Sequence, residues 1–306
     1  MSSKSYSLSL LAHPPVAKKH PHQLTTHQQT RTDNYYWMRD DERENEDVLA
    51  HLNAENDYCD KQLADIKPLR EQLFNELKDR IVKDDNTVPV KDGQYWYHSE
   101  VRGDDEYARH YRSSSIEARD KHLLLDVNQL AGDYEFYELG EVAISPDEQL
   151  LAYSEDTEGR RIYTVRFKNI ANGEMFSDVI ENTEGQVVWA NDSKTVFYVK
   201  KDLQTLLGFQ VYRHVLGTSQ ADDVLVYEEQ DKSFFMGLGK SRDESLIIID
   251  LATTETNDTW VLDANNPEGE FSALMPREEG HEFDVDKLGD TFYIVTNWQA
   301  KNFRLM

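Results

Sequence analysis

Residues that could support hydrolytic chemistry are sparse in this chain of 306 residues. Serine hydrolases of the α/β class hold the nucleophile in a G-x-S-x-G turn, and no segment of the chain has this pattern. The nearest serine after a glycine is Ser219, within Gly217–Ala221, where a turn between strands is predicted. None of the ten histidines is paired with a recognisable nucleophile. The sequence therefore assigns no catalytic residue.

Three histidines near the N-terminus raise the question of a metal site. His20, His22 and His27 lie close together, but no acidic or cysteine ligand shares a spacing with them. Solvated histidines are the favoured interpretation. The chain also has no glycine-rich phosphate loop and no other metal-ligand pattern. We expect neither a metal nor a cofactor.

Short strands are the elements that must position any site. In Val142–Phe167, strands are predicted at Val142–Ser145, Leu150–Ser154 and Ile162–Phe167. A turn at Pro146-Asp147 separates the first two, because proline presets φ at the second turn position and aspartate tolerates the next. This strand–turn–strand pattern recurs at intervals of about 45 to 51 residues. Its turn acids are Asp147, Asp192, Asp243 and Asp290, with a weaker copy at Asp92-Gly93.

A repeat of roughly 40–50 residues with about four short strands is the spacing of a β-propeller blade. An irregular β-sandwich is the alternative, but a sandwich has no reason to repeat. The third strands end in turns at Asn172-Gly173, Leu216-Gly217 and Asn265-Asn266-Pro267, and the fourth strands are expected at Met175–Ile180, Val224–Tyr227 and Phe271–Leu274.

The fifth copy begins at about His281 and reaches only its third strand. The prediction is a mainly β fold, an incomplete β-propeller of about four and a half four-stranded blades over residues 86–306, with blades 1–4 and part of blade 5. A propeller removes its sheet edges by closing the ring. We therefore expect the front part of a longer protein.

Residues 1–85 have a different character. Residues 1–34 predict an extended arm, and three aromatic residues, Tyr35–Trp37, predict an anchor. Asp40 or Asp41 is expected to cap a first helix. Pro68 suits the first turn of a second helix, whose apolar stripe is Leu69, Leu73, Leu77 and Ile81. The two helices form a hairpin with an apolar face that no other predicted helix covers.

The composition of the chain limits which classes of partner and which cellular compartment are expected. The net charge of −25 argues against nucleic acid and suits attraction of basic peptides, although solubility alone explains it as well. No apolar run approaches the ~20 residues of a membrane span. Cys59 is the single cysteine, so no internal disulfide can form, and a cytoplasmic location is the simplest interpretation.

Three segments resemble one family of enzymes. Asp33–Asn56 resembles the opening of the prolyl oligopeptidase family of serine peptidases, and Glu155–Glu174 and Thr296–Met306 are similar to its oligopeptidase B branch. The resemblance implies a seven-bladed propeller that caps an α/β-hydrolase domain, which follows the propeller in the chain. It also implies that the N-terminal arm and helices pack on that domain, and that the catalytic triad lies there, outside these residues.

The expected function is the N-terminal and propeller portion of an oligopeptidase B-like serine endopeptidase. The resemblance to the oligopeptidase B branch implies cleavage of short peptides after Lys or Arg, with the propeller as a size-selective gate, so this chain alone should be inactive. Arg160 and Arg161 are a candidate contact to the hydrolase domain, with a solvated surface pair as the alternative. Two alternatives remain: a free-standing propeller that binds peptides or proteins without catalysis, and a remnant of a broken gene.

Overall fold

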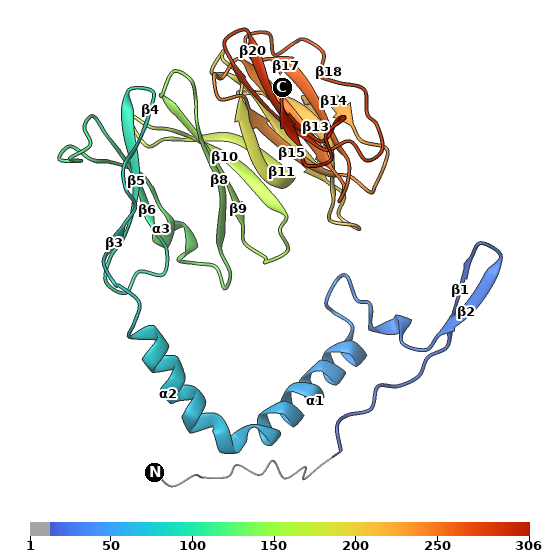
Figure 1. The fold of residues 1–306 in the computed structure, drawn as a ribbon. Helices are drawn as coiled ribbons and strands as arrows, with labels where there is room; N and C mark the ends of the chain where they lie inside the picture. The colour runs from blue at the N-terminus through green and yellow to red at the C-terminus, as the bar shows by residue number, and fades with distance from the viewer. Residues whose placement is uncertain (1–12) are drawn as a thin grey trace. The chain divides into compact units, whose positions relative to one another are not determined.

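The computed structural model describes residues 13–306, so the first twelve residues of the predicted arm lie outside it. The chain divides into two compact units, one that ends at Val82 and one that spans Lys83–Met306. The first unit holds the two longest helices, and the second consists almost entirely of antiparallel strands (Figure 1). The mainly β fold class predicted from the sequence is confirmed.

The described part of the N-terminal arm carries a β-hairpin that the sequence did not predict. Strands β1 (His22–Thr26) and β2 (Gln29–Asp33) pair antiparallel. His27 and Gln28 connect them with φ values of 51° and 64°. Such left-handed turns are usually signalled by Asn-Gly or Asp-Gly, and His-Gln gives no such signal. The strands also lack alternating apolar residues, so no period marks them.

The first helix begins later than the sequence predicted. After the short 3-10 turn η1 (Tyr36–Met38), helix α1 spans Glu46–Gln62. Its cap is Asn45, whose Oδ1 accepts hydrogen bonds from the backbone N–H of Asp47 (3.0 Å) and of Val48 (3.4 Å). The prediction that Asp40 or Asp41 is the cap is therefore wrong. The Asp40 carboxylate accepts instead from the N–H of Asn45 at 2.8 Å and orders the segment before the helix.

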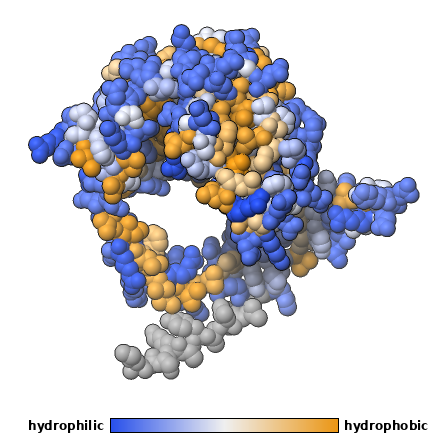
Figure 2. All heavy atoms as spheres, turned by 45° about the horizontal axis from the view of Figure 1, so that its top comes forward, coloured by the Kyte–Doolittle hydropathy of each residue, from blue (hydrophilic) through white to orange (hydrophobic). Residues whose placement is uncertain are grey.

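The second helix exposes its apolar residues. The 3-10 turn η2 (Ala64–Ile66) leads into α2 (Lys67–Lys78), with Pro68 in its first turn as predicted. Leu69, Leu73 and Leu77 are 40%, 48% and 63% exposed. Ile81 lies beyond the end of the helix and is 69% exposed. Apolar side chains gather along the helical segment in Figure 2. Exposed apolar faces of this size are common where a protein contacts another domain or partner.

The second unit is a succession of antiparallel sheets, which we call blades 1 to 5. Each strand pairs mainly with its neighbours in sequence, as the repeat predicted. Blade 1 contains β3 (Asp85–Asn86), β4 (Val90–Asp92), β5 (Tyr95–Val101), β6 (Arg109–Ser113) and β7 (His122–Asp126). Blade 2 contains β8 (Glu138–Ile144), β9 (Leu150–Asp156), β10 (Tyr163–Asn169) and the first part of β11 (Met175–Trp189). A short helix, α3 (Val127–Ala131), links the two blades and was not predicted.

Blades 3 to 5 repeat the arrangement. Blade 3 contains the second part of β11 with β12 (Thr195–Lys201), β13 (Gly208–Val215) and β14 (Val224–Glu228). Blade 4 contains β15 (Phe235–Lys240), β16 (Leu246–Ala252), β17 (Asn257–Asp263) and β18 (Ser272–Ala273). Blade 5 contains β19 (Phe283–Leu288), β20 (Thr291–Thr296) and β21 (Arg304–Leu305). Figure 1 shows the strands of blades 1 and 2 side by side, whereas those of blades 3 to 5 overlap in this view.

The turn between the first two strands of a blade explains the recurring aspartate. In blades 2, 3 and 4 a carboxylate oxygen of Asp147, Asp192 or Asp243 accepts the backbone N–H two residues later, at 3.1, 2.9 and 3.1 Å. This Asx arrangement closes the turn locally. The residue after each aspartate is left-handed, with φ of 59°, 56° and 57° at Glu148, Ser193 and Glu244. We call these segments the inner turns.

Strand β11 joins two blades into one sheet. Its first part pairs with β10 and its second part with β12, so blades 2 and 3 form a continuous seven-stranded sheet. The pairing with β12 shifts register between Thr183 and Val187, and Gly185 has φ of 103° there. A Cβ at Gly185 would lie 3.0 Å from the Tyr163 ring. Glycine is required at this position for both reasons.

Three apolar clusters fill the spaces between blades. Blades 1 and 2 share a cluster that includes Leu125, Leu151 and Ile170. The sheet shared by blades 2 and 3 buries Phe167 and Trp189, and blades 3 and 4 share a cluster around Phe197 and Ile249. The blades therefore pack face against face, and their first strands lie at a common inner side, where the functional site is found.

Candidate functional site

Ser219, the serine nearest to a nucleophile motif, has a structural role. Its hydroxyl caps the 3-10 turn η3 (Gln220–Asp222) by accepting the N–H of Ala221 at 3.3 Å. The buried imidazole of His214 lies five residues earlier in the chain, and carboxylates occupy both of its nitrogens. A histidine with no nitrogen available cannot act as the base of a serine.

The His214 cluster itself was not visible in the sequence. Nδ1 of His214 lies 2.7 Å from Oδ1 of Asp223, and Nε2 lies 3.3 Å from Oδ1 of Asp178. Tyr198 donates its hydroxyl to the other oxygen of Asp223 at 2.9 Å. Burial alone would lower the pKa of His214, but hydrogen bonds and charges from Asp223 and Asp178 raise it above its ordinary value. The imidazolium holds two buried carboxylates in blade 3.

The histidines of the arm contact aromatic rings. His22 stacks on Tyr36 with ring centroids 4.1 Å apart, and the His20 ring lies 5.4 Å from that of Trp37. His27 occupies the hairpin turn. Among residues 13–306, no group of three or more His, Cys, Asp or Glu side chains is placed to hold a metal ion.

Arg160 and Arg161 lie in the loop between β9 and β10, which the buried side chain of Asp156 organises. One oxygen of Asp156 accepts the N–H of Glu158 and of Gly159, and the other accepts the N–H of Arg161 at 2.7 Å. The ammonium of Lys201 also donates to the carbonyl of Arg161. Arg161 is exposed and Arg160 is half-buried. The loop therefore presents two neighbouring cations from a fixed backbone.

A large cavity in the second unit lies at the inner side of blades 1 to 4. It has a volume of about 900 Å³. We call it the inner pocket. Its apolar wall comes from the ends of three first strands, with Val142, Ile144, Val187 and Trp189 among its residues. The indole Nε1 of Trp189 donates to the carbonyl of Ala143 at 3.1 Å, so the ring is fixed. A cavity of this size with a mostly apolar wall is typical of ligand sites.

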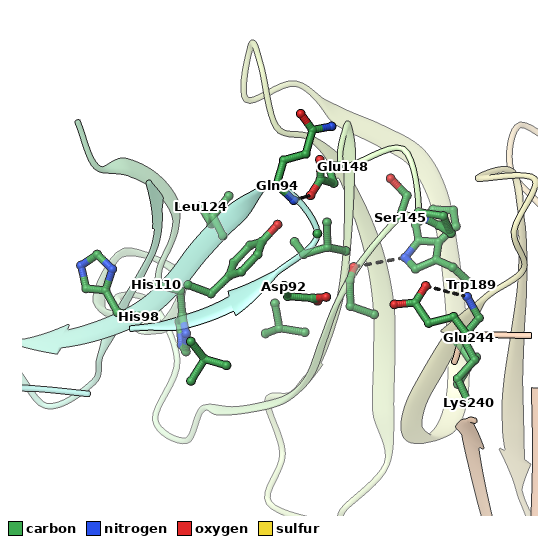
Figure 3. A pocket seen from close by; sticks show the side chains of 18 of the residues that line it. Asp92, Gln94, His98, His110, Leu124, Ser145, Glu148, Trp189, Lys240 and Glu244 are labelled. Atoms are coloured by element: carbon green, nitrogen blue, oxygen red, sulfur yellow. Dashed lines mark hydrogen bonds and ion pairs between the residues drawn. The ribbon is translucent and has the colours of Figure 1, made fainter. Parts of the chain in front are cut away.

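Charged groups from three blades border the inner pocket. Asp92 comes from blade 1, Glu148 from blade 2, and Lys240 with Glu244 from blade 4 (Figure 3). The Lys240 ammonium donates to Oδ1 of Asn191 at 2.7 Å and lies 3.6 Å from the Glu244 carboxylate. Burial lowers the pKa of Lys240, and the charges of Glu244 and, more weakly, Asp92 partly oppose this shift. The lysine is thus neutralised locally, while Asp92 and Glu148 leave the pocket with negative charge.

Successive inner turns are linked to one another around this pocket. Each link joins residues that are tens of positions apart in the chain. The links, in order, are Gln94 N–H to Glu148 Oε1 (2.6 Å), Asp147 N–H to Ser193 Oγ (3.0 Å), Asn191 Nδ2 to the Glu244 carbonyl (3.2 Å) and Gly289 N–H to Asp243 Oδ2 (3.0 Å). The rim of the pocket is therefore fixed before any ligand arrives.

Backbone conformation and the neighbouring Glu148 side chain both favour glycine at the first link. A Cβ at Gly93 would lie 2.1 Å from Oε1 of Glu148, and φ of Gly93 is +54°. The sequence marked Asp92-Gly93 only as a weak copy of the repeated turn, and it missed the pocket. The only sequence signal was that charged residues recur beside the turn acids, which by itself does not say that they face one space.

The five blades define this chain as a β-propeller domain. The family model described as "Prolyl oligopeptidase, N-terminal beta-propeller domain" matches residues 14–306. The chain therefore belongs to the prolyl oligopeptidase family and carries its N-terminal propeller domain, which confirms the resemblance found in the sequence.

Relatives and solved structures agree with this assignment. The chain is 42% identical to dipeptidyl aminopeptidase BI of Pseudoxanthomonas mexicana, over 98% of this chain and 44% of that protein. It is 28% identical to Protease 2 of Moraxella lacunata, over 95% of this chain and 43% of that protein. Oligopeptidase B from Leishmania major superposes with a TM-score of 0.89 at 31% identity, over 96% of this chain and 44% of that structure. The chain thus spans less than half the length of the relatives it matches.

One further finding concerns membranes. No helix within residues 13–306 is both long enough and apolar enough to cross a bilayer.

Proposed function

We propose that this chain is the propeller portion of a serine peptidase that cleaves short peptides after Lys or Arg in the cytoplasm. The observation that carries the proposal is the family match over residues 14–306, with structural similarity to an oligopeptidase B. The catalytic serine, histidine and acid come from an α/β-hydrolase domain outside residues 1–306. The propeller excludes folded proteins and admits unstructured peptides, as a gate to the active site.

Peptide hydrolysis tests this proposal directly. The full-length protein should release the fluorophore from a blocked arginyl peptide and leave a folded protein of similar composition intact. The 306-residue chain alone should release none. If this chain alone cleaves the peptide, and a serine-directed inhibitor abolishes that cleavage, the proposal that the catalytic residues lie outside residues 1–306 is contradicted. A full-length protein that binds peptides without cleaving them would favour the alternative in which the propeller binds peptides and no catalysis occurs.

A second candidate activity follows from the relative with 42% identity, which is named a dipeptidyl aminopeptidase. In this alternative the full-length enzyme removes dipeptides from a free N-terminus instead of cutting within the peptide. Two peptides of the same sequence, one with a free and one with an acetylated N-terminus, separate the possibilities. An endopeptidase cuts both, whereas a dipeptidyl peptidase cuts only the free form and yields dipeptides, which mass spectrometry identifies.

Two surfaces of the chain are proposed contacts to the hydrolase domain. The exposed apolar residues of α2, Leu73 and Leu77 among them, supply a face of the kind that a second domain covers. Arg160 and Arg161 supply two cations from a rigid loop. We expect at least one arginine to pair with a carboxylate of the hydrolase domain and to favour the closed form.

Charge reversal in the full-length enzyme tests the arginine pair. Arg160→Glu with Arg161→Glu should lower kcat/KM for peptides and shift small-angle scattering toward a more open form. Lys194→Glu with Lys200→Glu is a matched control, because these lysines lie on blade 3 and not on this loop. An effect no larger than that of the control assigns the arginines to the solvated surface.

A further inference from the structure

The inner pocket has two properties that its role in the fold does not explain. First, it is bordered by Val88 and Val90, which are 80% and 65% exposed. Large apolar side chains at the mouth of a cavity stabilise nothing in the folded chain while water covers them. Second, the carboxylate of Asp92 lines the pocket, and among residues 13–306 no side chain or backbone N–H donates a hydrogen bond to it. The two valines and Asp92 lie within five residues of one another, in or next to strand β4 of blade 1.

The charged side chains that line the pocket determine whether a cationic or an anionic ligand is favoured. Lys240 is occupied by Asn191 and Glu244. Arg242, the other cation of the wall, pairs at 3.0 Å with Asp286 of blade 5 and is largely exposed. Among residues 13–306, neither Asp92 nor Glu148 forms a hydrogen bond or an ion pair with a cationic side chain. The charge of Asp92 acts on Lys240 only at longer range, and Glu148 accepts one backbone N–H. A positive group entering beside the valines meets complementary charge, and a carboxylate meets repulsion.

We propose that the inner pocket binds a peptide segment in which a Lys or Arg side chain stands next to an apolar side chain. The apolar side chain covers Val88 and Val90 and reaches the wall formed by Val142 and Ile144. The ammonium or guanidinium lies between the carboxylates of Asp92 and Glu148 (Figure 3). The N–H of Gln94 holds the Glu148 carboxylate, and the link from Asp147 to Ser193 holds the turn that carries it, so binding needs little ordering at Glu148.

The choice of a peptide as ligand rests on the proposed peptidase function, whereas the pocket and its charge do not. A basic peptide is also favoured at long range, since the chain carries a net charge of −25. The binding assay below requires no hydrolysis. Failure of the peptidase proposal and failure of the pocket proposal are therefore separate results.

The test uses the full-length protein after reaction with a sulfonyl fluoride that blocks serine nucleophiles. The probe is a fluorescein-labelled Ala-Val-Lys-Val-Ala peptide, acetylated and amidated at its ends, and binding is measured by fluorescence anisotropy. Asp92→Asn should weaken binding about threefold to fivefold, as expected for one exposed charge pair. Val88→Ser should weaken it about threefold through lost apolar contact. Both side chains are exposed, so both variants should fold.

Matched controls come from the same unit. Asp290→Asn removes an exposed carboxylate from the corresponding hairpin of blade 5, and Val224→Ser removes a half-exposed valine from β14; neither lines the pocket. Both should bind the probe as the wild type does. Replacing the lysine of the probe by glutamine, or raising the salt concentration to 0.5 M, should reduce wild-type binding and abolish the effect of Asp92→Asn.

Equal binding by Asp92→Asn, Val88→Ser and the wild type would overturn the proposal. So would tighter binding of a glutamate-containing probe that is lost in Lys240→Met, because it would make the pocket a site for acidic peptides.

Discussion

Replacing His214 by alanine should destabilise the second unit strongly, because it leaves two buried carboxylates without their shared cation. The His214 side chain is fully buried, and those of Asp178 and Asp223 are 4% and 1% exposed. Two opposite charges 4 Å apart attract by about 4 kcal/mol at an effective dielectric of 20. Desolvation cancels part of this, and removing one member of a buried ion pair costs about 3–5 kcal/mol. We expect a loss of that size at pH 6.

The pH dependence identifies the cause. The pKa of His214 is raised in the folded state. A raised pKa means that the stabilisation is fully present below the unfolded value of about 6.5 and is lost as the pH rises through the folded value. The difference in unfolding free energy between wild type and His214→Ala should therefore shrink from pH 6 toward alkaline pH. A loss of packing alone would not change with pH in this way.

Urea unfolding, with hydrogen exchange of β11 and β13 measured by mass spectrometry, is the assay. His13→Ala is the control, because His13 is an exposed histidine of the N-terminal unit. The reasoning is refuted if His214→Ala costs less than about 1 kcal/mol at pH 6, below the range for a buried charge partner. It is equally refuted if the cost is the same at pH 6 and pH 9.

Three further predictions concern local features of the second unit. Asp156→Ala removes the acceptor of three backbone N–H groups, so it should cost about 2–3 kcal/mol and speed hydrogen exchange in the loop of Arg160 and Arg161, whereas Glu158→Ala should do neither. Gly185→Ala should cost about 1–3 kcal/mol in thermal unfolding, because φ is +103° and the new Cβ meets Tyr163; Gly280→Ala, also at positive φ but with open space around it, should cost less. Hydrogen bonds from Ser245 and Ser241, with the Lys287 ammonium, hold the pKa of Asp243 well below its ordinary value. A carboxylate whose pKa is lowered in the folded state stabilises the protein above its unfolded pKa of 3.8, and this stabilisation is lost as the pH falls through the folded pKa. Asp243→Asn should therefore lower the melting temperature at pH 6, and the melting temperatures of variant and wild type should converge in strong acid. A gap that stays constant down to pH 2 would contradict this last expectation.

Local chemistry explains which parts of the fold could be predicted from the sequence. An aspartate that closes its own turn through the N–H two residues later leaves the same mark in every blade, so Asp147, Asp192 and Asp243 revealed the repeat. The apolar stripe of α2 was also readable, because a helix places residues four apart on one face. The hairpin β1–β2 and the cap Asn45 were missed. The hairpin lacks both a turn signal and alternating apolar residues. The cap was missed because Asp40 and Asp41 are residue types that cap helices as well as Asn45 does.

The sequence by itself determined a chain of short strands that recur about every 45 to 51 residues, a helical segment with an apolar face, and the absence of a G-x-S-x-G nucleophile turn. Only the tertiary structure decided which side chains share a space. Asp178 and His214 come from β11 and β13, and Asp92, Glu148 and Glu244 come from three blades. Strand register and local bulges, such as the shift between Thr183 and Val187, set which face of a blade each side chain takes. Because these pairings join residues tens of positions apart, no local pattern in the sequence encodes the inner pocket or the His214 cluster.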